Sequence, residues 1–227
     1  MYFLSPFLRF FFKLLYHQFA WTYDWVAWTV SVGLWKDWVL AVLPFVEGPS
    51  ILELGHGPGH LQSRLLENGF RALGLDVSPQ MGRLARRRLR RRGQTASLIL
   101  GRAQSLPLAS GSCDQVVATF PTEYINDSDT LKEIWRVLRA GGHLVVLPAA
   151  WITGQRWMER YAAALFKITR QAPALPGYPG SPQASPYPLE FPLVDSLGQA
   201  GFQVHVEWKE LRSSTLILIL GKKPADE

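Results

Sequence analysis

The stretch Ile51-Leu52-Glu53-Leu54-Gly55-His56-Gly57-Pro58-Gly59 decides the fold. Its apolar beginning predicts a short buried strand of a parallel sheet, interrupted by one carboxylate. Three alternating glycines follow, and glycine adopts positive φ freely and lets a ligand approach the backbone closely. The segment from Gly59 to Leu66 predicts a helix whose first N–H groups point back at that ligand. A strand, a glycine loop and a helix in this order predict a nucleotide-type site at the carboxyl edge of a parallel sheet.

The residues around the glycines indicate which nucleotide. Dinucleotide-binding loops usually have the spacing G-x-G-x-x-G, whereas this loop has G-x-G-x-G. No Lys-Ser/Thr pair follows, which excludes a P-loop. Glu53 would repel a pyrophosphate, but it suits a cationic ligand such as the amino group and sulfonium of S-adenosylmethionine. Asp76 ends the next apolar run, where a carboxylate can accept hydrogen bonds from both ribose hydroxyls.

Further motifs occur in order along the chain, in residues 74–81, 101–108, 112–120 and 131–144. With them the chain resembles class I S-adenosylmethionine-dependent methyltransferases, in the type 11 branch that includes ubiquinone/menaquinone-biosynthesis and phospholipid methyltransferases. The resemblance covers residues 50–148 and a plausible closing hairpin. It implies an enzyme (EC 2.1.1.-) that uses S-adenosyl-L-methionine, releases S-adenosyl-L-homocysteine and needs no metal.

The resemblance also implies a set of cofactor-binding residues. Two positions depart from the family's pattern. Arg102 stands where the adenine segment usually has an acid, and His56 stands where the glycine loop usually has a small residue. A Tyr-Asp pair covers the cofactor in the family, and Tyr23-Asp24 matches it. The expected cofactor-binding residues are Tyr23, Glu53, Gly55, His56, Gly57, Gly59, Asp76, Val77, Met81, Arg102, Ala103 and Phe120.

Strand and helix patterns alternate between residues 50 and 148. This alternation predicts an α/β fold, a doubly wound Rossmann-like sheet with helices on both faces, mostly parallel and closed by an antiparallel C-terminal hairpin. Asp127 or Ser128 is expected to cap a helix that Gly141-Gly142 terminates. We expect strands near 50–54, 72–76, 96–100, 114–119, 143–148, 202–208 and 215–221, and helices near 59–68, 79–92, 128–139 and 193–200.

Composition sets further bounds. The chain has 227 residues, a net charge of +6, 48% hydrophobic residues and a single cysteine, Cys113. A lone buried thiol favours a reducing, cytoplasmic setting. Seven arginines crowd residues 83–92. They indicate either a solvated helix end or a patch for anionic lipid, with nucleic acid behind lipid.

Residues 1–45 differ from the rest of the chain. They hold 15 of its 28 aromatic residues, and Ser5, Arg9, Lys13 and His17 recur every four positions. This pattern is typical of a helix lying in a membrane interface, on the inner face of the membrane. The alternative is a helical cap packed over the ligand. Charged residues interrupt every window, so a spanning helix is not expected.

The rest of the chain, residues 46–227, is predicted to be one methyltransferase domain. Residues 149–192 interrupt the alternation with a basic amphipathic helix near 153–170 and a proline-rich stretch. Because an insertion after the fifth strand lies above the carboxyl edge of the sheet, we interpret it as a substrate lid, with an inert excursion as the alternative.

Candidate catalytic residues follow the fourth strand, in Phe120-Pro121-Thr122-Glu123-Tyr124. Glu123 could act as a base or hold a cationic amine, and Tyr124 could contact the substrate. The signature for methylating nucleic-acid amines is absent. The favoured function is methylation of a hydrophobic small molecule or lipid, a quinone precursor or phospholipid amine, at a membrane surface. The alternatives are a soluble small-molecule methyltransferase and a non-catalytic S-adenosylmethionine-binding module.

Overall fold

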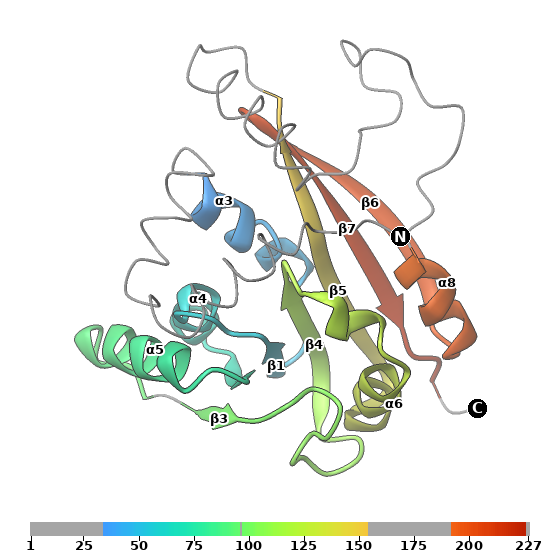
Figure 1. The fold of residues 1–227 in the computed structure, drawn as a ribbon, viewed down its shortest axis with the longest axis horizontal. Coiled ribbons are helices and arrows are strands. Elements are labelled where there is room, and N and C mark those ends of the chain that lie inside the picture. The colour runs from blue at the N-terminus through green and yellow to red at the C-terminus, as the bar shows by residue number, and fades with distance from the viewer. Residues whose placement is uncertain (1–33, 96, 154–191, 226–227) are drawn as a thin grey trace, which may run out of the picture.

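A computed structural model describes residues 34–95, 97–153 and 192–225 of the chain (Figure 1). Tyr23-Asp24, the aromatic segment before residue 34, and the basic helix and proline-rich stretch of the predicted lid lie outside these residues.

A seven-stranded sheet forms the centre of the molecule, with the order β3-β2-β1-β4-β5-β7-β6. The first five strands are parallel, and β7 runs antiparallel between β5 and β6. This arrangement confirms the predicted doubly wound sheet with its reversed C-terminal hairpin. The strands are β1 (Ser50–Leu54), β2 (Arg71–Asp76), β3 (Leu98–Leu100), β4 (Cys113–Thr119), β5 (Leu138–Ile152), β6 (Gln203–Leu211) and β7 (Ser214–Lys222).

Helices cover both faces of the sheet, because alternate strand residues are apolar toward each face. One core joins Ile51, Val117 and Val145 to α3 (Trp35–Leu40) and α4 (His60–Glu67). The other core joins Leu52 and Val116 to the helices that follow the later strands. Figure 1 shows α3, α4 and α5 on one side of the strands, and α6 and α8 on the other. These last helices are α5 (Pro79–Arg91), α6 (Ser128–Val137) and α8 (Pro192–Gln199), and short 3-10 turns span Leu43–Phe45 (η2) and Glu123–Asn126 (η3).

The helix α3 is part of the domain core although it precedes the predicted domain start at residue 46. Trp38 is buried, and its indole Nε1 donates a hydrogen bond of 2.8 Å to Ser214 Oγ at the start of β7. A tryptophan that joins the chain's early part to its last strand cannot belong to a separate unit. The described residues 34–45 therefore pack on the sheet, and the choice between a ligand cap and a membrane-interface helix for residues 1–45 stays a prediction.

Two local predictions are corrected. Gly141-Gly142 does not terminate α6, because the helix ends at Val137 and Leu138 is already extended, paired with Cys113 of β4. Gly141 instead adopts φ +73 within an irregular part of β5, where the register against β4 shifts. The strand also continues to Ile152, so the first residues of the predicted insertion belong to the sheet.

Other predictions agree with the structure. Asp127 caps α6, since its carboxylate accepts the Asp129 N–H at 2.9 Å. Cys113 is buried at the start of β4. Across residues 34–95, 97–153 and 192–225, no helix has the length and apolarity needed to cross a membrane.

Candidate functional site

The glycine loop after β1 turns sharply at the carboxyl edge of the sheet. Gly55, Gly57 and Gly59 have φ of +71, +51 and +80, which L side chains rarely adopt. The Gly55 N–H is held by the Leu75 carbonyl at 2.7 Å, so the turn is tied to the end of β2. A Cβ on Gly59 would lie 2.9 Å from Ala85 Cβ, which explains the glycine there by the close approach of α5. A Cβ on Gly57 would meet no atom closer than 4.0 Å, so the loop is open on that side.

Asp76 fixes the loop against β2. Its Oδ2 accepts the Gly57 N–H at 2.9 Å, and its Oδ1 accepts the Ser78 N–H at 2.8 Å. The side chain is buried at the end of β2. Each carboxylate oxygen has a second lone pair, so both can accept one more hydrogen bond. Asp76 is therefore suited to a ligand with two neighbouring hydroxyls.

Glu53 is the buried acid of the loop. It points from β1 toward α4, where Gln62 is also buried. Burial is the main cause that raises the pKa of Glu53 to about 8, Asp76 raises it further by charge repulsion, and the nearby Gln62 lowers it. Glu53 Oε2 and both amide atoms of Gln62 have no hydrogen-bond partner among the described residues. A buried carboxyl oxygen without a partner is costly and is suited to a cationic or hydrogen-donating ligand.

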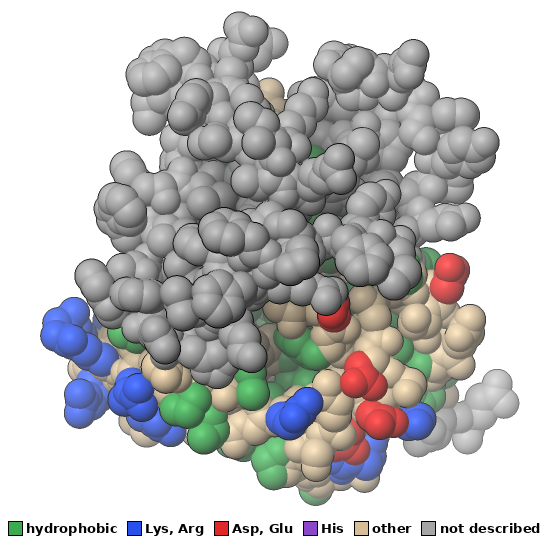
Figure 2. All heavy atoms as spheres, in the orientation of Figure 1, with side chains coloured by type: hydrophobic (Ala, Val, Ile, Leu, Met, Phe, Trp, Pro, Cys, Tyr) green, Lys and Arg blue, Asp and Glu red, His purple; other side chains and the backbone are tan. Residues whose placement is uncertain are grey.

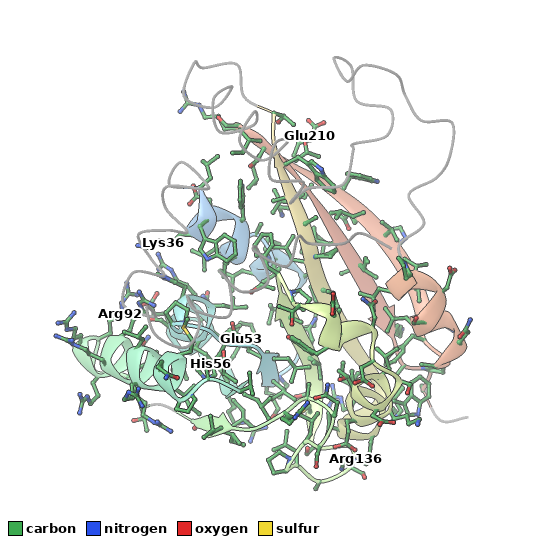
Figure 3. All side chains as sticks on the ribbon, in the orientation of Figure 1. Lys36, Glu53, His56, Arg92, Arg136 and Glu210 are labelled. Atoms are coloured by element: carbon green, nitrogen blue, oxygen red, sulfur yellow. The ribbon has the colours of Figure 1, made fainter. Side chains whose placement is uncertain are left out.

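His56 packs inside the loop and does not point out of it. Its Nδ1 lies 2.7 Å from the Gly57 carbonyl oxygen, and burial lowers the pKa of the imidazole although Asp76 opposes this effect. A neutral His56 can therefore donate from Nδ1 to that carbonyl. Figure 3 labels Glu53 and His56 close together at the centre of the molecule, between α4 and β3. A cavity of about 190 Å³ adjoins His56, and it is also lined by Asp76, Gly82 and Leu100.

Apolar side chains are exposed at the ends of β2 and β3. Val77 is 69% exposed and Leu100 is 60% exposed. Leu100 is the β3 partner of Asp76 in the sheet register. These aliphatic side chains lie next to Asp76, whose carboxylate can accept hydrogen bonds from sugar hydroxyls. They are suited to contact the faces of a flat base. Met81 is fully buried at the start of α5.

The segment that follows β3 in the chain leads away from this apolar edge toward α6. Ala103 is buried and Arg102 is exposed. Its continuation is tied to α6, because Glu133 accepts the Leu106 N–H at 2.6 Å and Arg136 donates to the Leu106 carbonyl at 3.0 Å. Arg136, labelled in Figure 3, also pairs with Glu133 at 2.7 Å. These bonds fix a loop without regular structure beside the site.

Aromatic side chains gather where β4 ends. Phe120 has φ +48, the one positive φ among the described non-glycine residues. Its ring stacks on Trp35 with centroids 4.5 Å apart, and Trp38 lies 6.1 Å away. Such a backbone conformation costs about 1–3 kcal/mol and is found preferentially at functional sites. The backbone of Phe120 is therefore strained at the point where the aromatic side chains meet, at the carboxyl edge of the sheet.

The two candidate catalytic residues lie on η3, immediately after Phe120. Tyr124 reaches the glycine loop, since its hydroxyl donates to the Leu54 carbonyl at 3.3 Å and would lie 3.1 Å from a Cβ on Gly55. Glu123 is exposed on the same turn. The structure thus brings Tyr124 to the loop, and it leaves Glu123 at the surface beside it.

Sequence reasoning missed four residues of this region. Gln62 could have been found, because it is a polar residue on the buried face of a helix. Leu100 could have been found from its register opposite Asp76. Trp35 and Trp38 carry no local signal for the site, since only the folded chain brings α3 against Phe120.

The fold and the loop together define a class I methyltransferase, and comparison with known proteins agrees. Residues 52–146 match the family described as a methyltransferase domain. The uncharacterized methyltransferase YdaC of Bacillus subtilis is 28% identical over 194 residues, which cover 84% of this chain and 92% of YdaC. The ubiquinone/menaquinone biosynthesis C-methyltransferase UbiE of Rhizobium meliloti is 33% identical over 144 residues, which cover 59% of this chain and 56% of UbiE.

Solved structures show the same fold. A putative S-adenosyl-L-methionine-dependent methyltransferase of Methanococcus maripaludis matches with a TM-score of 0.62 at 16% identity, over 93% of this chain and 95% of that one. These matches support an S-adenosylmethionine-dependent methyltransferase with S-adenosylmethionine as its cofactor, and the family match covers residues 52–146.

Proposed function

We propose that the protein methylates a hydrophobic small molecule or lipid, such as a quinone precursor or a phospholipid amine, at a membrane surface. The observation that carries this proposal is the stacked pair Trp35 and Phe120 at the carboxyl edge of the sheet, where both side chains are half-buried and the buried Trp38 supports them. Aromatic rings offer a large apolar contact area to a ring or an acyl chain. Relatives named for quinone biosynthesis agree with such an acceptor.

The cofactor is proposed to lie across the glycine loop. Asp76 would accept hydrogen bonds from the ribose hydroxyls with the lone pairs that Gly57 and Ser78 leave open. Glu53, with its unpartnered oxygen, would hold the amino group. Gly55, Gly57 and Gly59 would let the ligand lie on the backbone. This arrangement fits a cationic nucleoside with a free amino group.

The adenine is proposed to lie at the apolar edge beside Asp76. Val77 and Leu100 would contact its faces, and the backbone of Ala103 would contact its edge. Met81 would support the base from below. Arg102 is exposed and carries no acid for the amino group of adenine. His56 would shape the loop through its contact with Gly57, and Phe120 would border the methionine end.

The chain's own residues position the reactants. When bound, S-adenosylmethionine supplies a methyl group that is already activated on a sulfonium. Alignment of two reactants can supply about 7–11 kcal/mol of the barrier, so the stacked pair and Tyr124 contribute mainly by holding the acceptor in line and excluding water. Glu123 is proposed to accept a proton from an acceptor that must lose one, or to hold a cationic amine.

The proposal is tested with methyl-labelled S-adenosylmethionine and two acceptors, a demethylated quinone analogue and phosphatidylethanolamine, each presented in vesicles. We expect label in the organic extract with one of them. Phe120→Ala should raise the KM for that acceptor by a larger factor than it weakens cofactor binding, because Phe120 would border only the methionine end of the cofactor. Trp208→Ala, in the C-terminal hairpin, is the matched control, because its ring contacts Trp151 and not the site.

Two results would overturn the proposal. The first is transfer only to small polar acceptors. The second is an equal loss of activity in the Phe120 and Trp208 variants, because it would show that the stacked pair at the site has no specific role in acceptor binding.

A further inference from the structure

A row of arginines borders a groove on the outer side of α5. The groove has a volume of about 320 Å³ and is lined by Pro58, Leu84, Arg87, Arg88, Arg91 and Arg92. We call it the arginine groove. Figure 2 shows Lys and Arg side chains gathered at the left of the molecule, where Figure 1 places α5.

The sequence places these side chains on one side of the helix. Positions 84, 87, 88, 91 and 92 follow the spacing i, i+3, i+4, i+7 and i+8, so they form one stripe. The adjacent stripe, Met81, Ala85 and Leu89, is fully buried against the domain. Leu84 is the one apolar side chain of α5 that lines the groove, and it lies among long cationic side chains beside Pro58 of the glycine loop.

The fold neutralises only part of this charge. Arg92 pairs with Glu67 of α4 at 2.6 Å, and Arg88 donates a hydrogen bond to the Pro58 carbonyl. Arg87 and Arg91 form no ion pair with any residue that the structure describes. Like charges four positions apart on a helix repel each other and destabilise it. Among the described residues no ion pair offsets the repulsion between Arg87 and Arg91, which is expected where an external anion binds.

We propose that the arginine groove binds the phosphate headgroups of anionic phospholipids in a membrane surface. Guanidinium groups bind phosphate oxygens through paired N–H donors, and Leu84 offers an apolar contact to the glycerol and acyl region. Single-stranded nucleic acid is disfavoured, since proteins that bind it combine basic grooves with stacking aromatics and residues 79–92 contain none. The inference deepens the proposed function and rests on it for the membrane location alone.

The groove adjoins the cofactor loop. Pro58 belongs both to the groove and to the loop, and Arg88 contacts its carbonyl oxygen. A membrane bound at the groove would therefore lie next to the glycine loop. Binding of headgroups needs no methyl acceptor, so it can be measured separately from catalysis.

The experiment uses the full chain and two kinds of vesicle, pure phosphatidylcholine and phosphatidylcholine mixed with phosphatidylglycerol. Sedimentation gives the partition coefficient for each. The test variant is Arg87→Gln/Arg91→Gln. The matched control is Arg71→Gln/Arg212→Gln, which removes the same charge from two exposed arginines outside the groove. Cofactor affinity, measured for all three proteins, reports whether each is folded.

We expect stronger binding to the phosphatidylglycerol vesicles than to pure phosphatidylcholine. Each basic residue at an anionic surface contributes about fivefold to partitioning, so the test variant should lose about 25-fold. The control should lose much less. Failure of methyl transfer with vesicle binding intact would overturn the proposed function and leave the groove assignment standing.

Three results would overturn the groove assignment. One is equal partitioning of the wild type to both vesicle types. Another is an equal loss in the test and control variants, which would show a general charge effect. The third is tight binding of the wild type to a single-stranded RNA of about 20 nucleotides without binding to the anionic vesicles.

Discussion

Replacing Glu53 by Gln should remove a pH dependence of S-adenosylmethionine binding. The wild-type pKa is about 8 because the carboxyl is buried, with Asp76 adding repulsion. The ionised form holds a cationic ligand better, so affinity should follow the ionised fraction below this pKa. That fraction rises from about 1% at pH 6 to about 24% at pH 7.5, and we expect affinity to rise about 25-fold over this range.

The assay is isothermal titration at several pH values and in buffers of different ionisation enthalpy. Binding near pH 7 should release almost one proton from wild-type Glu53. The ligand's own amino group titrates near pH 8, but this effect is common to the wild type and to Glu53→Gln, so their difference isolates the carboxyl. Burial lowers the pKa of His56, and this residue is common to both proteins, so their difference still isolates the carboxyl.

The same substitution gives an independent stability readout. Burial raises the folded-state pKa of Glu53 from its ordinary value of 4.5 to about 8, so the ligand-free wild type loses stability as pH rises from about 4.5 to about 8. The full difference corresponds to at most about 5 kcal/mol. Glu53→Gln should lack this loss and be the more stable protein at pH 8. Equal pH profiles of binding and stability in the two proteins would refute the reasoning.

Three further predictions concern other parts of the fold. Asp76→Ala should weaken S-adenosylmethionine binding at least tenfold, because each hydrogen bond to a charged acceptor contributes about 1.5–3 kcal/mol; unchanged calorimetric affinity would contradict the assignment. Trp38→Phe removes the buried bond to Ser214 and should lower the free energy of unfolding in urea by about 1–2 kcal/mol, whereas Trp208→Phe should change it little. Burial raises the pKa of the Cys113 thiol, so iodoacetamide should alkylate the native protein far more slowly than the protein in urea, and rapid native labelling would show that the thiol is exposed.

The central sheet could be predicted because most of its strands are short apolar runs that turn-forming or polar residues bound at both ends. The run before Gly55 and the run before Val77 end at residues that the structure places at the same sheet edge, as the parallel pairing of β1 and β2 requires. The reversed hairpin followed from two β-rich segments near the end of the chain. These signals are local, so a single sequence carries them.

The errors arose where distant contacts override a local pattern. Gly141-Gly142 is a plausible helix stop, but pairing of Leu138 with Cys113 draws the chain into the sheet earlier. The extension of β5 to Ile152 depends on its antiparallel partner Ser214. The packing of Trp35 on Phe120 joins segments 85 positions apart in numbering, and no spacing rule within either segment predicts it.

The candidate site was predictable to a similar degree. The acids and glycines lie in two short motifs, and the structure brings them together through the bond from Gly57 to Asp76. The burial of Glu53 beside Gln62 required the fold, because it depends on how α4 crosses the strand. Tyr23 lies outside the described residues, and its role in covering the cofactor stays a prediction.

The most direct test of the account is calorimetric titration of the folded protein with S-adenosylmethionine and with S-adenosylhomocysteine. We predict that each ligand binds at one site with micromolar affinity, and that Asp76→Ala weakens both. A folded protein that binds neither ligand would contradict the assignment of the glycine loop, Glu53 and Asp76 as the cofactor site.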